Sequence, residues 1–284
     1  MDERAALGLV GGLVERAGDD AAVLGETVVS IDMLHETTDF PPGTTRYTAG
    51  WRAVGASLSD VAAMGADATG ALGVYAAPTF EDDALREFVR GALDVCEAVG
   101  TEYVGGDLDD HDEFTVATTA LGETPSPVRR SGATPGEVVA VTGALGRSAA
   151  AMDAFDAGDV ARANGLFRFT PRVRAGRALR WRAGAMMDSS DGLARSLHQL
   201  AEASDVGFAI SGDSVPIHDA LAGPGRRERA VTFGEDFELV CTLPADAVDD
   251  ARAAMDVPLT VVGDVTEGGV RMDGEALPDV GYTH

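Results

Sequence analysis

Apolar and polar positions along this chain follow two periods, one typical of helices and one typical of strands. In residues 45–66 the apolar side chains recur every three or four positions, which predicts a helix with one buried face. The residues expected on that face are Trp51, Val54, Leu58 and Val61. Gly65 follows directly and is expected to end the helix, because glycine readily adopts the left-handed conformation found there.

The remaining pattern divides the chain into two mixed halves. Further helices are expected over residues 2–16, 80–100, 145–155, about 171–182, 192–204 and 245–255. Strands are expected over residues 21–32, 68–78, 101–107, 113–123, 138–142, 184–188, 206–211, 237–244 and 259–265. Proline, glycine and serine concentrate in residues 124–137, which predicts a boundary between a domain of residues 1–127 and one of residues 128–284. Strands and helices mixed in both halves predict an α/β or α+β architecture.

The strongly negative net charge of the chain limits the kinds of partner that it can bind. The formal net charge of the 284 residues is −25, and all 22 basic residues are arginines. Nucleic acids and anionic membranes need basic surfaces, so neither is expected as a partner. So much acid predicts a salt-loving host, because molar salt shortens the Debye length to about 3 Å and screens self-repulsion. Without lysine, the chain cannot form a lysine Schiff base or use a lysine general base.

The same composition favours the cytoplasm. No apolar run reaches the roughly 20 residues that a membrane helix needs, and the acidic start of the chain does not resemble a signal peptide. Cys96 and Cys241 stand far apart in no metal-binding pattern, so we expect two buried, reduced thiols.

Several acidic residues stand where a predicted strand or helix ends. Asp20 precedes a strand, Asp32 ends the same strand two residues after Ser30, and Asp60 lies off the apolar face near the end of its helix. Hydroxyl and carboxylate oxygens are suitable Mg²⁺ ligands, and a cation would relieve the conflict between Asp60 and the helix dipole. Each residue alone also has a plain alternative: a solvated turn for Asp20, a strand-ending aspartate for Asp32, and a surface acid in an acid-rich protein for Asp60.

Three more stretches carry acids beside glycines. Asp107 follows Gly106 after a strand, where glycine allows close approach of a phosphate but also suits any tight turn. In "MDSSDG" Asp188 ends a strand, and Ser190 or Asp191 is expected to cap the next helix, whose N-terminus could also receive a phosphate. "GEDFEL" places Glu235 between a glycine and a strand, where a polar turn is the plain alternative. Taken together, these acids predict phosphate chemistry with several magnesium ions.

A series of motifs extends over nearly the whole chain. In chain order they are "GDDAAVL", "SIDMLHETTDF", "SLSDVAAMGAD", "GGD", "RSGATPGE", "VTGALGRSAA", "MDSSDGLA" and "GEDFEL". The sequence resembles the thiamine-monophosphate kinase family, in the superfamily of aminoimidazole ribonucleotide synthetase-like proteins. The resemblance implies a two-domain fold whose N-terminal sheet forms a barrel-like homodimer interface, with ATP in a cleft. It also implies phosphorylation of thiamine monophosphate by ATP through direct in-line transfer, with several Mg²⁺ ions.

Site residues follow from the resemblance position by position. The implied metal ligands are Asp20, Ser30, Asp32, Asp60, Asp107, Asp188 and Asp191. The implied ATP contacts are Gly106, Asp107, Arg130 and Ser190. Of these residues, Asp32, Asp107, Asp188 and Arg130 are assigned to catalysis, with Arg130 in place of a lysine. The implied substrate contacts are Asp39, Glu235 and Tyr282.

The chain departs from the family pattern at two positions. Ile31 stands where the family usually has threonine, so it could bind a metal only through its backbone. Asp39 stands where the family has a histidine on the substrate side, and Tyr282 is the nearest candidate for an aromatic residue near the C-terminus. Two alternatives remain open: another ATP-dependent synthetase of the superfamily, and a sensor that binds divalent metal or nucleotide without catalysis.

Overall fold

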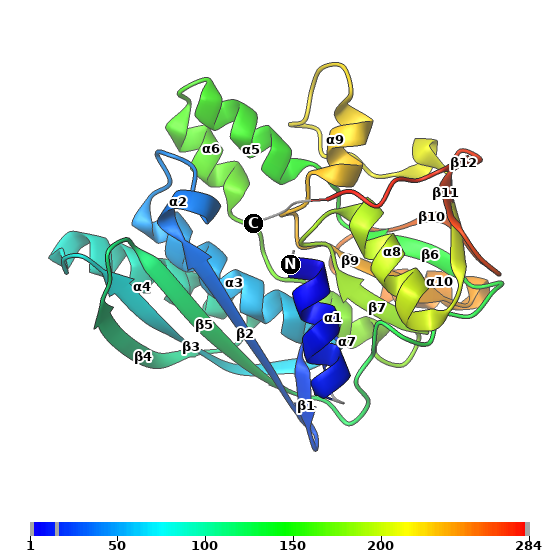
Figure 1. The fold of residues 1–284 in the computed structure, drawn as a ribbon, viewed down its shortest axis with the longest axis horizontal. Coiled ribbons are helices and arrows are strands. Elements are labelled where there is room, and N and C mark those ends of the chain that lie inside the picture. The colour runs from blue at the N-terminus through cyan, green and yellow to red at the C-terminus, as the bar shows by residue number, and fades with distance from the viewer. Residues whose placement is uncertain (1–2, 15–16, 282–284) are drawn as a thin grey trace.

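The computed structural model describes residues 3–14 and 17–281, which form two sheets with their helices (Figure 1). The helices are α1 (Glu3–Leu13), α2 (Glu36–Asp39), α3 (Arg46–Ala63), α4 (Asp82–Val99), α5 (Arg147–Asp156), α6 (Val160–Phe167), α7 (Val173–Leu179), α8 (Leu193–Ser204), α9 (Arg226–Thr232) and α10 (Val248–Ala253), with 3-10 turns η1 (Gly212–Ser214) and η2 (Ala245–Ala247). The strands are β1 (Ala22–Leu24), β2 (Thr27–His35), β3 (Asp67–Ala77), β4 (Tyr103–Asp110), β5 (Thr115–Glu123), β6 (Val138–Thr142), β7 (Ala185–Asp188), β8 (Gly207–Ile210), β9 (Leu239–Leu243), β10 (Leu259–Thr266), β11 (Val270–Met272) and β12 (Glu275–Ala276). This mixed two-part fold confirms the predicted α/β (α+β) class.

The N-terminal half builds the first sheet, in the order β1-β2-β5-β3-β4 among the described residues. Its neighbours pair antiparallel except β3 and β4, which are parallel. Helix α3 packs on one face of this sheet, and the predicted apolar face of the helix is confirmed because Val54, Leu58 and Val61 are buried. Gly65 follows the helix with a φ of 65°, as expected of a residue that ends it.

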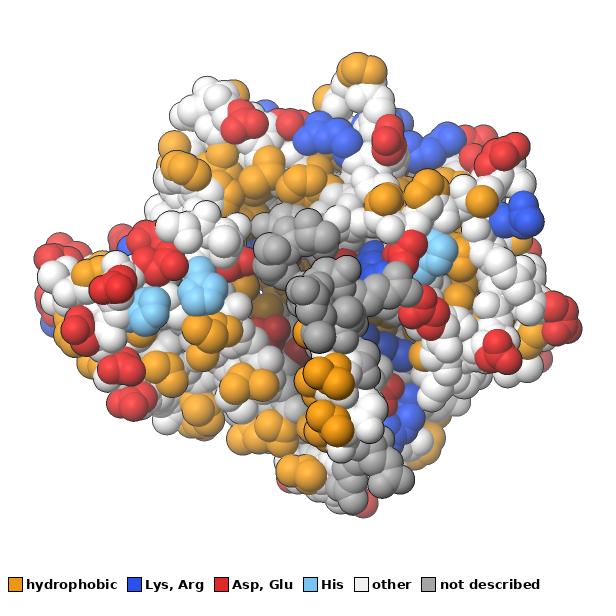
Figure 2. Space-filling model, viewed as in Figure 1, with side chains coloured by type: hydrophobic (Ala, Val, Ile, Leu, Met, Phe, Trp, Pro, Cys, Tyr) orange, Lys and Arg blue, Asp and Glu red, His pale blue; other side chains and the backbone are white. Residues whose placement is uncertain are grey.

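The other face of the first sheet exposes apolar side chains. Strand register places Ile31 and Met33 of β2 on the same face as Leu121 of β5 and Leu72 and Val74 of β3. Ile31 is 74% exposed and Met33 is 56% exposed. Figure 2 shows hydrophobic side chains gathered over these strands at the lower left. We call these five residues the open sheet face.

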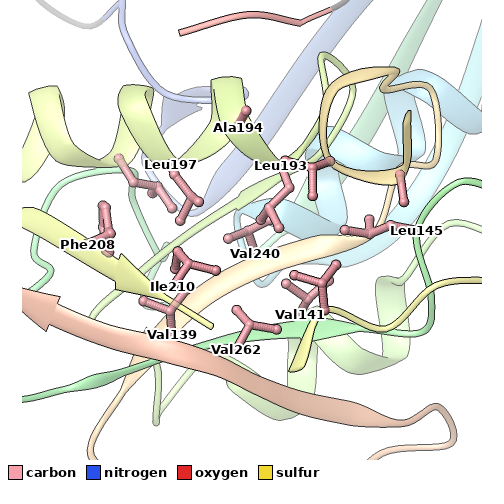
Figure 3. Packing of buried hydrophobic residues seen from close by; sticks show 14 of the residues in the cluster. Val139, Val141, Leu145, Leu193, Ala194, Leu197, Phe208, Ile210, Val240 and Val262 are labelled. Atoms are coloured by element: carbon pink, nitrogen blue, oxygen red, sulfur yellow. The ribbon is translucent and has the colours of Figure 1, made fainter. Parts of the chain in front are cut away.

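The C-terminal half builds the second sheet, in the order β12-β11-β8-β10-β6-β9-β7 within the part of the chain that the structure describes. Its neighbours are antiparallel except β8 and β11. On one face, Leu193 and Leu197 of α8 pack against Val139, Val240 and other apolar side chains of the strands (Figure 3). This core fixes the position of the turn that joins β7 to α8.

Helix α3 belongs to both halves of the molecule. Ala62 and Ala63, in its last turn, are buried in a second core together with Leu179 of α7 and with Met186 and Cys241 of the second sheet. One rigid helix therefore touches the first sheet along its length and the second sheet at its end. Side chains on α3 can consequently take part in a site built from both halves.

Most of the expected elements are confirmed within a few residues, including α3, α4, α8 and the strands of both sheets. The sequence did not predict the short elements α2, α6, α9, β11 and β12. Both cysteines are buried and free, as expected. Among the described residues, every helix is too short or too polar to cross a bilayer.

Candidate active site

Three aspartates from distant parts of the chain come together between the two halves. Asp20 precedes β1, Asp60 lies in the last turn of α3, and Asp188 ends β7. Each offers a carboxylate oxygen, and these oxygens all lie within 4.8 Å of one another. We call these residues the acidic cluster. One or two divalent cations could bridge oxygens at this spacing, and carboxylates are the ligands that Mg²⁺ prefers.

The acidic cluster is electrostatically unfavourable by itself. Burial and the neighbouring charge of Asp20 raise the pKa of Asp188 to about 8, although Ser59 and Arg130 oppose this shift. Burial, followed by the charges of Asp32, Asp188 and Asp20, raises the pKa of Asp60 well above its ordinary value. A bound divalent cation would reverse both effects, because it favours the ionised carboxylates.

Two serine hydroxyls orient the cluster. The Ser30 Oγ donates a hydrogen bond to Asp60 Oδ2, and the Ser59 Oγ donates one to Asp188 Oδ2 at 2.6 Å. Asp32 lies two residues after Ser30 on the same face of β2, and its charge acts on both Asp60 and Asp188. Ser30 and Asp32 therefore lie beside the acidic cluster.

Arg130 supplies a positive charge at the cluster. Its Nε and Nη2 donate to the two carboxylate oxygens of Asp20 at 3.2 and 3.0 Å. Burial alone would lower the pKa of Arg130, but the charges of Asp20, Asp188 and Asp60 raise it above its usual value. The backbone N–H of Arg130 also donates to Asp19 at 3.0 Å. These contacts fix the segment before β1 to the C-terminal half.

The "MDSSDG" turn and the segment Gly234–Glu238, here called the GEDFE loop, are joined through their backbones. The N–H of Glu235 donates to the carbonyl oxygen of Ser190 at 2.6 Å, and the N–H of Ser189 donates to that of Glu238 at 2.8 Å. Gly234 has a φ of 82°, and a Cβ there would lie 2.4 Å from the Ser190 oxygen. Only glycine fits this close approach.

The expected helix cap at Ser190 or Asp191 is wrong. Helix α8 begins at Leu193, and its N-cap residue is Gly192, which has no side chain with which to cap it. Gly192 has a φ of 98° and turns the chain between the two serines and the helix, while the Ser190 carbonyl is engaged with the GEDFE loop. Asp191 is partly exposed and is not one of the three aspartates whose oxygens converge.

A pocket of about 190 Å³ lies between the two halves. Its lining includes Asp39 of α2, Phe40, Phe167 at the end of α6, and Glu235 of the GEDFE loop. Asp39 is held in place, because its Oδ2 accepts hydrogen bonds from the His35 N–H and the Thr38 hydroxyl, both at 2.7 Å. This interdomain pocket has apolar walls and two carboxylates, which suits a cationic ring system.

Sequence reasoning missed Arg52, which is 2% exposed within α3. Its guanidinium donates hydrogen bonds to Glu235 and to the backbone oxygen of Phe167, and it lies 3.6 Å from the centroid of the Phe167 ring. A signal was present in the sequence. After its first turn, helix α3 is apolar or small except for two charged residues, Arg52 and Asp60, and both lie off its apolar face.

The remaining expected site residues do not join the cluster within one chain. Gly106 and Asp107 lie on β4, and β3 and β5 separate β4 from β2. Three strand spacings amount to about 14 Å. Asp107 is exposed, and its carboxylate accepts a hydrogen bond from the adjacent N–H of Leu108 at 2.9 Å. Tyr282 lies outside the described residues.

Comparison with known proteins agrees with this fold. The model of the AIR synthase related protein N-terminal domain matches residues 18–124, and the model of the corresponding C-terminal domain matches residues 134–273. The fold and the interdomain site thus define an AIR synthase-related protein.

Full-length relatives narrow the class further. The thiamine-monophosphate kinase of Halobacterium salinarum is 66% identical over 288 residues, covering 100% of both chains. That of Methanospirillum hungatei is 39% identical, covering 100% of this chain and 99% of the relative. A solved structure described as "AaThiL complexed with AMPPCP and TMP" superposes with a TM-score of 0.91 at 27% identity, covering 100% of this chain and 97% of the other. This chain belongs to the thiamine-monophosphate kinase family, whose members are ATP-dependent phosphotransferases.

Proposed function

We propose that this chain transfers the γ-phosphoryl group of ATP directly to thiamine monophosphate, giving thiamine diphosphate and ADP. An oxygen of the substrate phosphate attacks the γ-phosphorus, and the bond from that phosphorus to the β-phosphate oxygen breaks. The observation that carries the proposal is an acidic cluster between the two halves, beside a pocket for a cationic ring, in a chain of this family. Positioning and charge stabilisation account for the rate of such transfers.

The residues that would lie beside the phosphate groups of ATP and thiamine monophosphate carry the oxygen ligands that magnesium prefers. We propose Asp20, Asp60 and Asp188 as the central ligands, with Ser30 and Asp32 next to them and Asp191 at the adjoining turn. When bound, Mg²⁺ neutralises phosphate charge and so lets two anions approach each other. The donor set supports this assignment, because the carboxylates of Asp60 and Asp188, whose ionisation is opposed by their surroundings, become favourable ligands beside Asp20 once a cation is present.

The nucleotide and the substrate ring take opposite ends of the site in this proposal. Arg130 and Ser190 lie beside the cluster, where they would contact the phosphates of ATP. Arg130 is already paired with Asp20, so it contributes charge and also orients a metal ligand. Asp39 and Glu235 line the interdomain pocket and would face the cationic thiazolium and the pyrimidine of the substrate.

We further propose that the chain acts as a homodimer. The open sheet face exposes apolar side chains beside the exposed strand β4, as expected of a surface that a second copy covers. Gly106 and Asp107 lie on β4, so dimerisation would bring their backbone and carboxylate into a shared interface. Residues 1–127 would then form the metal-binding and dimerisation domain, and residues 128–284 the second domain.

The net charge of −25 supports a salt-rich cytoplasm as the working environment. The partners in this proposal are thiamine monophosphate, ATP and a second copy of the chain.

A coupled assay of ADP release tests the function. The purified protein in high KCl with Mg²⁺ and ATP should release ADP only when thiamine monophosphate is added, and the product should be thiamine diphosphate by chromatography. ADP release that depends instead on another small-molecule acceptor would favour a different synthetase of the superfamily. ATP binding without turnover would favour the sensor.

A further inference from the structure

Arg52 contacts two residues of the interdomain pocket wall from the side that faces away from the pocket. Its Nη1 donates to the backbone oxygen of Phe167, and its Nη2 donates to Oε2 of Glu235. Both Phe167 and Glu235 line the interdomain pocket, whereas Arg52 is 2% exposed and is not part of the lining. The guanidinium also packs 3.6 Å from the centroid of the Phe167 ring. One side chain therefore fixes an aromatic wall and a carboxylate together.

The contact crosses between the halves of the molecule. Arg52 belongs to α3, which packs on the first sheet, whereas Phe167 and Glu235 belong to the C-terminal half. A buried guanidinium with two hydrogen-bonded partners is rigid, because its planar fork has little freedom left. The width of the pocket is thereby tied to the position of α3.

Glu235 needs such support because its backbone is strained. Its φ is 63°, and Phe237, two residues later, has a φ of 54°. Residues other than glycine seldom adopt these values, and they keep them only where surrounding contacts enforce them. Phe237 is held by stacking on Phe169 at 4.1 Å between centroids, and Glu235 is held by Arg52.

We propose that Arg52 is a positioning residue for the substrate ring, acting through Glu235 and Phe167. This inference rests on the proposed function. Arg52 also offsets the charge of the Glu235 carboxylate when the pocket is empty. Asp60 follows Arg52 by eight residues on the same helix, which is about 12 Å along its axis. Helix α3 thus sets the separation between the ring end and the phosphate end of the site.

Steady-state kinetics and calorimetric titration with thiamine monophosphate test this role in the full chain. Arg52→Gln should raise KM and Kd for thiamine monophosphate by about 10- to 100-fold, the effect expected for one charged hydrogen bond. The KM for ATP should stay within about twofold, because the contact lies at the ring end. The double variant of Arg52→Gln with Glu235→Gln should bind thiamine monophosphate more tightly than the product of the two single effects predicts, since Arg52 acts partly through Glu235.

Two further variants separate positioning from general stability. Arg52→Lys keeps the charge but lacks the fork that reaches both walls, so KM for thiamine monophosphate should stay raised even where the melting temperature recovers. Trp51→Phe is the matched control. Trp51 donates from the same turn of α3 to the backbone of Phe169, which does not line the pocket, so KM should change by less than about twofold.

Three results would overturn the inference: additive effects in the double variant, full recovery of KM by lysine, or an equal rise in KM in Trp51→Phe. The proposed function fails in a different way. A wild-type chain that binds thiamine monophosphate without releasing ADP would refute the kinase activity, while the titrations would still report whether Arg52 acts partly through Glu235.

Discussion

Replacing Asp188 with asparagine should stabilise the metal-free protein at high pH and abolish most of its activity. The pKa of Asp188 is about 8 in the folded chain against an ordinary value of 3.8, and the side chain is buried. A carboxyl whose pKa is raised on folding stabilises the folded state fully at low pH, and this contribution is lost as pH rises to about 8. Asparagine has nearly the same shape and cannot ionise, so the stability of the variant does not fall for this reason as pH rises.

The size of the effect follows from the shift. Each pH unit between the two values removes about 1.4 kcal/mol of stability for one carboxyl. Across the whole window the loss is of the order of 5 kcal/mol, and for a chain of this size each kcal/mol moves the melting temperature by roughly 2 °C. In EDTA, wild type and Asp188→Asn should melt together near pH 4, and the variant should melt about 10 °C higher at pH 8.

Magnesium should reverse the order of the two melting temperatures at pH 8. In the proposed function the folded state binds Mg²⁺, which should therefore raise the melting temperature of the wild type much more than that of Asp188→Asn. Turnover of the variant should fall at least about 100-fold, because the variant lacks a carboxylate proposed to hold Mg²⁺ beside the phosphates. Asp191→Asn is the matched control from the same turn and should show no such pH-dependent gain. Parallel melting curves of wild type and Asp188→Asn from pH 4 to 9 would refute the electrostatic reasoning.

Three other predictions concern protons, salt and assembly. Mg²⁺ binding at pH 7 should release about one proton per chain, because the pKa of about 8 leaves Asp188 protonated before the metal binds. Calorimetry in buffers of different ionisation enthalpy measures the number of protons released, and a value of zero would contradict the prediction. Raising KCl from 0.1 to 2 M should raise the melting temperature, since salt screens the repulsion within a net charge of −25. A melting temperature that does not change with KCl would argue against an acidic surface adapted to high salt. Ile31→Asp should give a monomer in light scattering after gel filtration, because it places a charge on the open sheet face. Val160→Asp, at an exposed apolar residue of α6 in the C-terminal half, should leave the oligomeric state unchanged. A dimer that persists in Ile31→Asp would place the interface elsewhere.

The fold was predictable where a local pattern decides the structure. The face of α3 that carries Val54 and Leu58 repeats at the helical period, and long buried strands stand out by their β-branched residues. Short elements depend on packing instead. Helix α6 is capped by Asp159 and has eight residues, and α9 follows Gly225 without a side-chain cap, so neither produces a clear signal before the chain is folded.

The site was predictable only in part, because strand register decides which acids meet. Asp20, Asp60 and Asp188 each stood at the end of an element, as did Asp107 and Asp191, and the residue types alone do not separate these two groups. Asp107 lies on β4, three strand positions from β2. The reason is that β5 inserts between β2 and β3, and β5 pairs with β2 although their partner residues are 80 to 96 positions apart in the sequence.

Close mutual approach is what distinguishes the acidic cluster from the other acids of this acidic chain. Most of its 47 acidic residues need no explanation beyond solubility, because solvent and salt screen them. Asp60 and Asp188 are instead packed against each other and Asp20, where their ionisation is costly. Arg130 and the hydroxyls of Ser30 and Ser59 offset part of this cost. Because a core of apolar side chains would be more stable, the arrangement makes physical sense as a site completed by bound cations and phosphate.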